Sequence, residues 1–570
     1  MLEIFIPILM SVIVDGGLYR EEDFMLHSLF PEALIANRNR FVLIVGALMV
    51  FVACLSMVCG LLSARCAAVA SQGFARNLRS DLLEKIQSFS FSNIDRFSTP
   101  SLITRGTTDV NTVRNAMHQL LRTLSRSPIM LIMATVMAFA IAPRLALFFL
   151  LAIPLLAGVL AILMKIGQPR FRKMLQKTDA MNRAVQENLV SSRVVKAYVR
   201  GDYESERFRD TAEELRRATL SSSRLFTLTG PIQMLIMWGC TILILLFGGR
   251  EIIFEKTGLL TGELVSIVSY ATQAVNSLTM LTWLIMSMSR AQASLVRINE
   301  VLDETPDIAA GSCAEAVADG SVDFEDVCFS YSKSPDKLAI KHISFHIGAG
   351  ETIGIIGGTG EGKSTLVNLI PRFYDTFSGT VRVGGRDVKD YTLEVLRDSV
   401  SMVLQNGTLF SGTIADNLRW GKPDATAAEM REACAVACAD EFIDRFPEGY
   451  ETVLEQNAAN LSGGQRQRLR IARAVIKQPK ILILDDSTSA VDMSTDEHIR
   501  RALRTALQGT TKIIIAQRIA SIMSCDRILV LDEGRLSDIG THEELMARSH
   551  IYREVYHSQM REEAGVHGEG

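Results

Sequence analysis

The segment with the clearest chemical meaning is a glycine-rich loop that ends in a lysine and two hydroxyl residues. It follows the apolar run Thr352–Ile356 and precedes a helical pattern, Thr365–Ile370. Its spacing matches GxxxxGK[ST], in which glycines let backbone N–H groups surround phosphate oxygens. We expect Lys363 to reach the β- and γ-phosphates and Ser364 to bind Mg²⁺. The predicted nucleotide-binding residues of this loop are Gly357, Gly358, Thr359, Gly360, Glu361, Gly362, Lys363, Ser364 and Thr365.

A second candidate group stands at the end of a buried-strand pattern. The run Ile481–Asp485 is apolar until its last residue. In P-loop proteins a carboxylate at this position holds Mg²⁺, and we predict that role for Asp485. A strand that ends in Asp is common by itself, so the prediction depends on the P-loop in the same chain.

These residues require an α/β domain to position them. From Ser321 onward, short β patterns alternate with helical ones, which predicts such a domain over residues 321–556. Residues 306–320 are small and polar and are interpreted as a linker. Residues 557–570 are mostly small and charged, and we expect a disordered tail there.

The first half of the chain, residues 1–305, has a different character. A helix needs about 20 apolar residues to cross a bilayer. A shorter apolar run, Ile4–Val14, is interpreted as the outer half of a first membrane helix whose inner half is missing; an interfacial anchor is the alternative. Five uncharged runs are long enough to span or nearly so: Phe41–Ala64, Ser127–Pro143, Leu145–Met164, Leu225–Gly249 and Val265–Ser289.

Basic residues predict the orientation of these helices. The segments Arg65–Arg126 and Lys165–Arg224 carry nine and fourteen Lys or Arg, far more than the other connections. Such segments stay in the cytoplasm. Both keep helical apolar spacing, so we expect helical rods beyond the bilayer. Their tips are predicted near Ser98–Thr107 and Gly201–Glu206, where turn and cap residues stand.

Composition excludes some classes of protein. The net charge is −3, which gives no support for a nucleic-acid partner. Cys434 and Cys438 lie one helical turn apart without the further ligands of a zinc site. No charged residue lies inside the five runs, so an ion-coupled mechanism has no evident carrier there.

One further motif identifies a family. Leu461–Gln465 has the sequence LSGGQ, and it resembles the signature of ABC ATPases; the resemblance covers nearly the whole chain. It implies six membrane helices per half and a dimer of two halves. ATP would lie between the P-loop of one half and the signature of the other, so Ser462, Gly463, Gly464 and Gln465 would contact nucleotide on a partner chain.

The resemblance also implies roles for individual residues. Tyr331 matches the aromatic residue that stacks on adenine, and Gln405 matches the glutamine that senses the γ-phosphate and Mg²⁺. Ser489–Asp492 matches the D-loop. The tips of the rods would be coupling helices that dock on the ATPase domains.

Two positions depart from the family pattern. The family has Glu after the strand-end aspartate to orient or deprotonate the attacking water, and this chain has Asp486, which is one methylene shorter. Small misplacements of a general base cost about a hundredfold in rate. The family has His where Gln517 stands, and Gln cannot carry a proton or a positive charge.

The sequence therefore predicts an ATP-driven exporter subunit in the cytoplasmic membrane, in contact with lipid. It carries a small molecule, lipid or peptide whose identity the sequence does not give. Asp486, Gln517 and Gln405 are the candidate catalytic residues, and ATP with Mg²⁺ is the predicted cofactor, with Ser364, Gln405 and Asp485 as metal ligands. The departures favour the degenerate-site subunit of a heterodimeric multidrug-type exporter. A slow homodimer and a nucleotide-gated membrane regulator are the alternatives, and the apolar runs exclude a soluble ABC ATPase.

Overall fold

The chain forms two compact units in a computed structural model. The structure describes residues 2–19, 26–27, 30–31, 35, 37–255, 258–405, 407–486 and 491–566. The first, the membrane unit, comprises Met1–Gln87 and Pro100–Glu304. The second, the P-loop unit, comprises Ser88–Thr99 and Thr305–Gly570. Each unit is described by itself.

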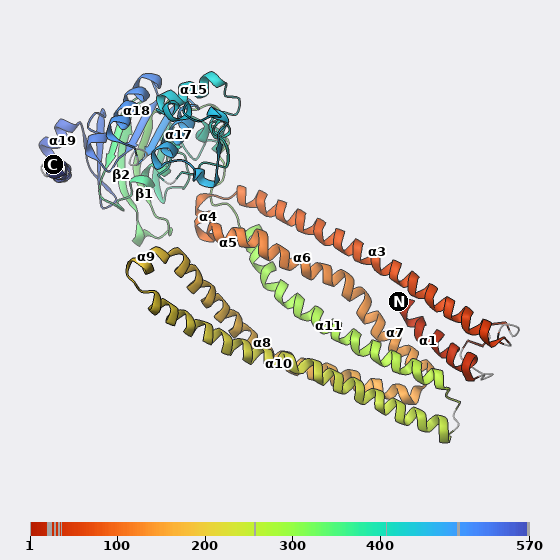
Figure 1. Ribbon diagram of the computed structural model, residues 1–570. Helices are drawn as coiled ribbons and strands as arrows, with labels where there is room; N and C mark the ends of the chain where they lie inside the picture. The colour runs from red at the N-terminus through yellow and green to blue at the C-terminus, as the bar shows by residue number, and fades with distance from the viewer. Residues whose placement is uncertain are drawn as a thin grey trace. The chain divides into compact units, whose positions relative to one another are not determined.

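The membrane unit is built from long helices (Figure 1). Within the described residues, six helical segments are long and apolar enough to cross a bilayer, which is the number that the family resemblance implies. The first runs over Leu2–Tyr19 and includes α1. The helices are α1 (Phe5–Val12), α3 (Arg38–Gln87), α5 (Thr99–Thr104), α6 (Val110–Gln119), α7 (Ser125–Ile141), α8 (Pro143–Val190), α9 (Ser192–Ala197), α10 (Gly201–Arg250) and α11 (Thr261–Leu302), with π-helical segments at Arg105–Asp109 and Leu120–Leu124.

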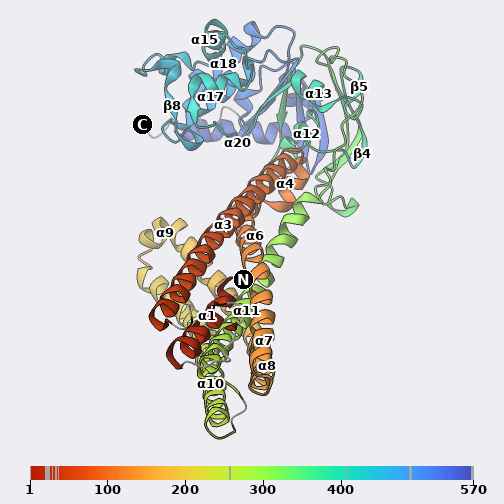
Figure 2. The same ribbon diagram turned by 90° about the vertical axis from the view of Figure 1, so that its right-hand side faces the viewer.

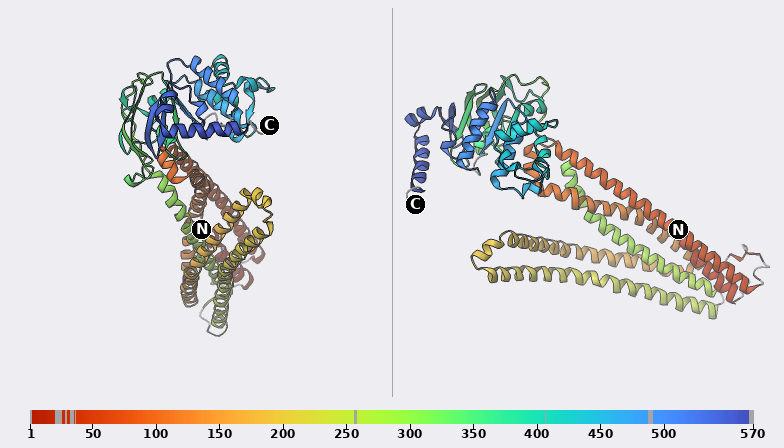
Figure 3. Two further views of the ribbon diagram at one scale, coloured as in Figure 1. Left: turned by 90° about the vertical axis from the view of Figure 1, so that its left-hand side faces the viewer. Right: turned by 45° about the horizontal axis from the view of Figure 1, so that its top comes forward.

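Long helices run through both basic segments, and the chain reverses at or just before each predicted tip. The chain turns at Ser88–Ser98, around α4 (Phe91–Phe97), and again at Ser191–Arg200, around α9. Pro100 lies in the first turn of the returning helix α5, where its missing N–H costs nothing. Asp202 and Glu204 lie in the first turn of α10, where carboxylates favour the helix dipole. Of the turn or cap roles predicted for these residues, the structure shows the second: they begin the return helices. Figure 3 shows α8 and α10 side by side, joined through α9.

Polar contacts on either side of α1 join the first helical segment, Leu2–Tyr19, to α11. The Tyr270 hydroxyl donates to the carbonyl of Ile4 at 2.6 Å, and the Gly262 N–H donates to Asp15 Oδ1 at 2.6 Å. A Cβ at position 262 would lie 2.6 Å from Asp15 Oδ2, so only glycine permits this approach. Hydrogen bonds between helices are favourable where water is excluded.

The P-loop unit contains the predicted α/β fold (Figure 2). A six-stranded sheet has the order β12-β11-β3-β10-β9-β6, and its strands from β11 to β6 are parallel. A second, antiparallel sheet has the order β2-β1-β4-β5. The strands are β1 (Val322–Phe329), β2 (Ile340–Ile347), β3 (Thr352–Ile356), β4 (Ser378–Val383), β5 (Arg386–Asp387), β6 (Val400–Val403), β7 (Gly412–Thr413), β8 (Val453–Leu454), β9 (Ile481–Asp485), β10 (Thr511–Ile515), β11 (Arg527–Asp532) and β12 (Arg535–Gly540).

Helices complete this unit. A helical subdomain packs around Leu418, Met430, Phe442 and Leu469, in one core with residues of β6 and β9. The α-helices are α12 (Lys363–Asn368), α13 (Leu393–Ser399), α14 (Ile414–Arg419), α15 (Ala427–Val436), α16 (Asp440–Ile443), α17 (Gly463–Val475), α18 (Met493–Ala506), α19 (His542–Arg548) and α20 (His550–Val566).

The tip helix α4 belongs to the P-loop unit through aromatic and polar contacts. The Phe91 ring stacks on Phe373 with centroids 4.4 Å apart, and the Tyr374 hydroxyl donates to Asp95 at 2.7 Å. Ser92 donates to Asp307 at 2.8 Å. These contacts support the docking of this tip on an ATPase domain that the resemblance implies.

Two segments expected to be irregular are bound to the P-loop unit. In residues 306–320, the Gly311 N–H donates to the carbonyl of Tyr391, and Val317 is buried. Within the segment predicted to be a disordered tail, α20 continues past His557 to Val566. The ring of Tyr552 is fully buried and anchors that helix to the domain. Residues 567–570 lie outside the described residues.

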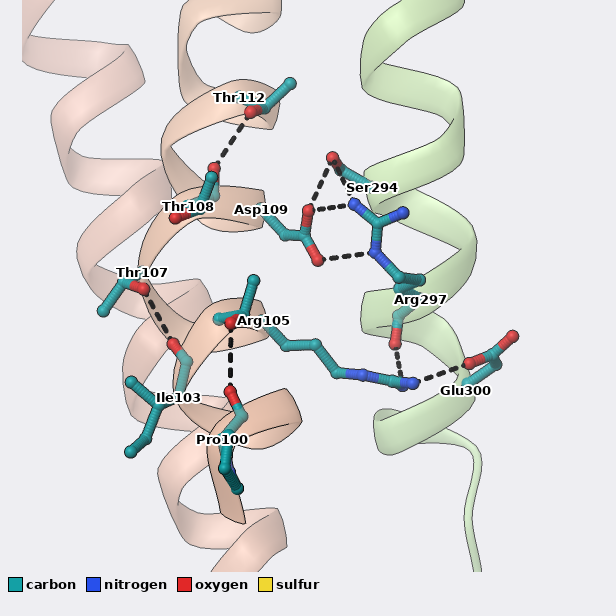
Figure 4. A network of polar contacts seen from close by, with 11 residues as sticks. Pro100, Ile103, Arg105, Thr107, Thr108, Asp109, Thr112, Ser294, Arg297 and Glu300 are labelled. Carbon is teal, nitrogen blue, oxygen red and sulfur yellow. Dashed lines mark hydrogen bonds and ion pairs between the residues drawn. The ribbon is translucent and has the colours of Figure 1, made fainter. Parts of the chain in front are cut away.

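A buried ion pair joins α11 to the return helix of the first rod (Figure 4). Asp109 is only 2% exposed, and it accepts from Arg297 Nε and from Ser294 Oγ, both at 2.8 Å. Arg105 binds Glu300 at 3.0 Å beside it, but the Glu300 side chain is 51% exposed. In each pair one side chain is buried and the other is about half exposed, since Arg297 is 47% exposed and Arg105 is 10% exposed. The two pairs differ in which partner is buried: the carboxylate of Asp109 in one and the guanidinium of Arg105 in the other.

We expect Asp109→Asn to destabilise the membrane unit by about 1–3 kcal/mol, because it leaves the Arg297 guanidinium without its buried counter-charge. The Glu300→Gln variant is the matched control and should cost at most about 1 kcal/mol, since the exposed amide keeps an oxygen that can accept from Arg105, which also donates to the carbonyl of Arg297. Thermal unfolding in detergent measures both. Equal midpoints for the two variants would contradict this ranking.

Candidate functional site

The candidate site lies at one edge of the parallel sheet. The P-loop follows β3, Gln405 follows β6, and Asp485 ends β9. Gln517 follows β10, which pairs with both β3 and β9. The carboxyl ends of parallel strands meet at one edge of a sheet, which is where such folds bind ligands. The structure therefore brings together predicted residues that are up to 160 positions apart in the sequence.

The P-loop has the backbone that phosphate binding requires. Gly360 and Gly362 have φ values of +87° and +88°, a region that favours glycine. Lys363 Nζ donates to the carbonyl oxygens of Gly357 and Gly358 at 2.9 and 2.6 Å, so the ammonium lies across the loop. This arrangement fits a polyphosphate. Thr359 lies within the same loop.

Glu361 adds a negative charge to the same loop. A Cβ at Gly358 would lie 2.7 Å from Glu361 Oε1, so the carboxylate folds back over the first glycines. Its other oxygen, Oε2, is buried without a hydrogen-bond partner in the described part of the chain. From the motif alone Glu361 was an ordinary loop position, and nothing in the motif indicates where its side chain points.

The predicted metal ligands include a pair of oxygen donors in contact. Ser364 Oγ donates to Asp485 Oδ1 at 3.0 Å. Hydroxyl and carboxylate oxygens are the ligands that Mg²⁺ prefers, and the ion usually binds one or two carboxylates together with substrate phosphates. The donor set thus fits Mg²⁺. The metal would polarise the phosphate oxygens of a bound nucleotide.

Asp486 is held by three glutamine side chains. Its Oδ2 accepts from Gln517 Nε2 at 2.8 Å and from Gln405 Nε2 at 3.2 Å. Gln467 Nε2 in α17 donates to its backbone carbonyl at 3.3 Å. The backbone of Asp486 has φ of 46°, which is uncommon for a residue with a Cβ. All three predicted catalytic residues, Asp486, Gln517 and Gln405, therefore meet at one carboxylate oxygen.

Burial sets the electrostatics of this site. It raises the pKa of Asp486 above its ordinary value, although the hydrogen bonds from Gln405 and Gln517 and the charges of Lys363 and Arg518 act in the opposite direction. Burial also raises the pKa of Asp485, and the nearby charge of Asp486 adds to that effect. Burial lowers the pKa of Lys363 against the attraction of the surrounding carboxylates. A cation bound beside the two Asp side chains would favour the ionised form of both.

Tyr331 lies next to the helix that begins in the P-loop. Its hydroxyl is 2.9 Å from Thr365 Oγ1, and its ring is 54% exposed. The ring also meets Tyr374 edge-on, with centroids 5.3 Å apart. An exposed ring at this position can stack on a base, so the predicted adenine contact stays a prediction with suitable geometry.

The signature residues form a helix start rather than part of this chain's P-loop site. Ser462 caps α17 and exchanges hydrogen bonds with Gln465, while Gly463 and Gly464 begin the helix. Among the described residues, no hydrogen bond joins Ser462–Gln465 to the P-loop. Ser489 and Ala490 of the predicted D-loop lie outside the described residues.

Two residues near the site were missed from the sequence. The sequence motifs assigned no role to Gln467, and Gln559 fell in the predicted tail. Gln559 Nε2 donates to the carbonyl of Gln517 at 2.7 Å. Helical spacing from Tyr552 through Val555 and Tyr556 to Gln559 is the signal that could have indicated a packed helix there.

We expect Lys363→Met to weaken MgATP binding about ten- to a hundredfold, because it removes charge-assisted hydrogen bonds to phosphate. Lys389→Met, at an exposed lysine of the same unit, should leave affinity unchanged. Equilibrium binding of a fluorescent ATP analogue to the purified chain measures both. Unchanged affinity in Lys363→Met would show that the loop does not hold the phosphates.

Comparison with known proteins agrees with this geometry. Residues 1–278 match the family described as ABC transporter transmembrane region, and residues 340–489 match the family described as ABC transporter. The uncharacterized ABC transporter ATP-binding protein YfiB of Bacillus subtilis is 38% identical over 98% of this chain and 94% of its own length. An ATP-dependent lipid A-core flippase of Desulfotalea psychrophila is 33% identical over 86% of this chain and 85% of its own.

A solved structure shares the whole architecture. A bacterial Atm1-family ABC exporter with ATP bound superposes with a TM-score of 0.79 at 25% identity, covering 98% of this chain and 96% of that one. The chain therefore belongs to the ABC transporter family, as a multi-pass membrane exporter with a cytoplasmic ATPase domain that couples ATP hydrolysis to transport.

Proposed function

We propose that this chain is the degenerate-site subunit of a heterodimeric ABC exporter. Its own P-loop site binds ATP and Mg²⁺ and hydrolyses ATP slowly. Its signature, Ser462–Gln465, completes the active site of a partner half. In this proposal residues Gly357–Thr365 hold the phosphates, Tyr331 stacks on adenine, and Ser364, Gln405 and Asp485 hold Mg²⁺.

The observation that carries the proposal is the shared carboxylate oxygen of Asp486. Two amide groups, from Gln517 and Gln405, donate to Oδ2 at 2.8 and 3.2 Å. A general base needs a free lone pair within hydrogen-bond reach of the attacking water. This carboxylate is shorter than the family's glutamate, and one of its oxygens already serves two amides.

Gln517, the second departure from the family pattern, limits the catalytic chemistry further. An amide neither gains nor loses a proton near neutral pH, so Gln517 orients its neighbours without supplying a charge. The family's histidine can carry a proton there. The two substitutions act on one site because their side chains are in direct contact.

The intact signature supports a role across a dimer interface. Ser462 and Gln465 keep the reciprocal hydrogen bonds that start α17, which leaves the N-terminal end of that helix formed and available. ABC exporters work as dimers, and a partner with the family's glutamate and histidine would form one competent site with this signature. For the cargo we propose a small molecule, lipid or peptide; the relative named as a lipid A-core flippase makes lipids the first class to test.

We expect the purified chain in lipid nanodiscs to bind MgATP and to turn it over slowly. The double variant Asp486→Glu with Gln517→His should raise turnover at least about tenfold, because it restores the reach of the base and a protonatable partner. Phosphate release and nucleotide binding are measured on the same samples. Adding Lys363→Met to the double variant is the control, and it should remove the gain.

Brisk turnover by the unmodified chain would contradict the degenerate site and favour a homodimer. A natural partner that also carries Asp and Gln at these two positions would contradict the heterodimer in the same way.

A further inference from the structure

The C-terminal helix α20 reaches the loop that carries Gln517. The side-chain amide of Gln559 makes two hydrogen bonds to that loop's backbone. Its Nε2 donates to the carbonyl of Gln517 at 2.7 Å, and its Oε1 accepts from the N–H of Ile519 at 2.8 Å. Arg518, between them, is extended with φ of −101° and ψ of 127°.

The two hydrogen bonds require a primary amide at position 559. In an extended segment, the carbonyl before a residue and the N–H after it point to the same side, as they do at the edge of a sheet. The primary amide of a glutamine places an acceptor oxygen beside an N–H donor, so it can bind both backbone groups at once. The Gln559 side chain thus pairs with the backbone of residues 517–519 through one donated and one accepted hydrogen bond, as a neighbouring strand would. A carboxylate at position 559 could accept from Ile519 but could not donate to Gln517.

The helix that presents Gln559 is itself fixed. Tyr552 is fully buried, and its hydroxyl lies 2.8 Å from His542 Nδ1. The ring belongs to the same apolar cluster as Ala516 and Ile519, which flank the loop. Gln559 lies two helical turns after Tyr552, so both side chains project from one face of α20. Figure 2 shows α20 running along the P-loop unit.

We propose that Gln559 is the positioning residue of this loop: it fixes the main chain at 517–519 so that Gln517 donates to Asp486. The chain of contacts is short and continuous. Gln559 holds the Gln517 carbonyl, Gln517 Nε2 holds Asp486 Oδ2, and Asp486 stands beside the metal ligand Asp485. The C-terminal helix is therefore part of the catalytic apparatus, and its attachment sets how Gln517 faces the nucleotide. This inference rests on the proposed role of Gln517, but the backbone contact can be tested without it.

Hydrogen–deuterium exchange on the full chain in lipid nanodiscs tests the contact. In Gln559→Ala, amides of the segment 517–521 should exchange about five- to tenfold faster, because Ile519 loses its acceptor. Gln559→Glu should also loosen the segment, since it sets a carboxylate against a carbonyl. Ser558→Ala, at the exposed neighbour on the same helix, is the matched control and should change nothing. Unchanged exchange in Gln559→Ala would overturn the inference, and so would equal acceleration in Ser558→Ala.

Turnover tests the positioning. In the variant Asp486→Glu with Gln517→His, Gln559→Ala should lower kcat about tenfold and leave KM for ATP unchanged, because the side chain at position 517 is no longer held in place. In a Gln517→Ala background it should have no further effect, because the group being positioned is already gone. A faster-exchanging loop with unchanged kcat would overturn the positioning role. Brisk turnover by the unmodified chain would contradict the degenerate site alone, and the comparison of kcat values would still decide the role of Gln559.

Discussion

The parallel hydrogen-bond ladder of β3, β10, β9 and β6 is the constraint on which the site depends. Ile515 pairs in register with Asp485, and Ile355 pairs with Ile515. Since neighbouring parallel strands point the same way, the segments that follow them must leave at one edge. Every residue of β3 and β9 is buried, so a shift of register would expose apolar side chains to water. Core packing thus places the P-loop, Asp485 and the segment of Gln517 side by side.

At the edge of this sheet, glutamine side chains position Asp486 and the backbone beside it. Gln405, Gln517 and Gln467 all hold Asp486, and Gln559 in turn holds the backbone of Gln517. Amides orient their partners without changing charge, whereas burial works against ionisation of both aspartates. The result is a site whose donors and acceptors suit a cation and phosphates, and in which Asp486 Oδ2 already accepts from two amides. The same C-terminal helix that closes the hydrophobic cluster around Tyr552 takes part in this order.

The helices of the membrane unit could be predicted for a different physical reason. Its helices satisfy their own backbones, so length and apolarity alone predicted that they exist. Their ends were harder to predict. Pro100 and Asp202 are compatible with a turn and with a helix start, and the structure uses both as helix starts. The chain reverses just before them, around the short helices α4 and α9, whose polar and apolar residues carry no strong turn signal.

The sequence by itself determined the motifs and the class of fold. Spacing predicted the P-loop, the signature, the strand-end aspartate and the two departures at Asp486 and Gln517, because these depend on neighbours within a few residues. Tertiary structure alone decided that Gln517 and Gln405 share one oxygen of Asp486, that Glu361 folds back over Gly358, and that Gln559 braces the Gln517 loop. Residues 517 and 559 are brought together only by the packing of strands and helices, and polar composition at the end of the chain hid that contact. Local sequence fixes which groups exist, whereas the burial of distant apolar side chains fixes which of them meet.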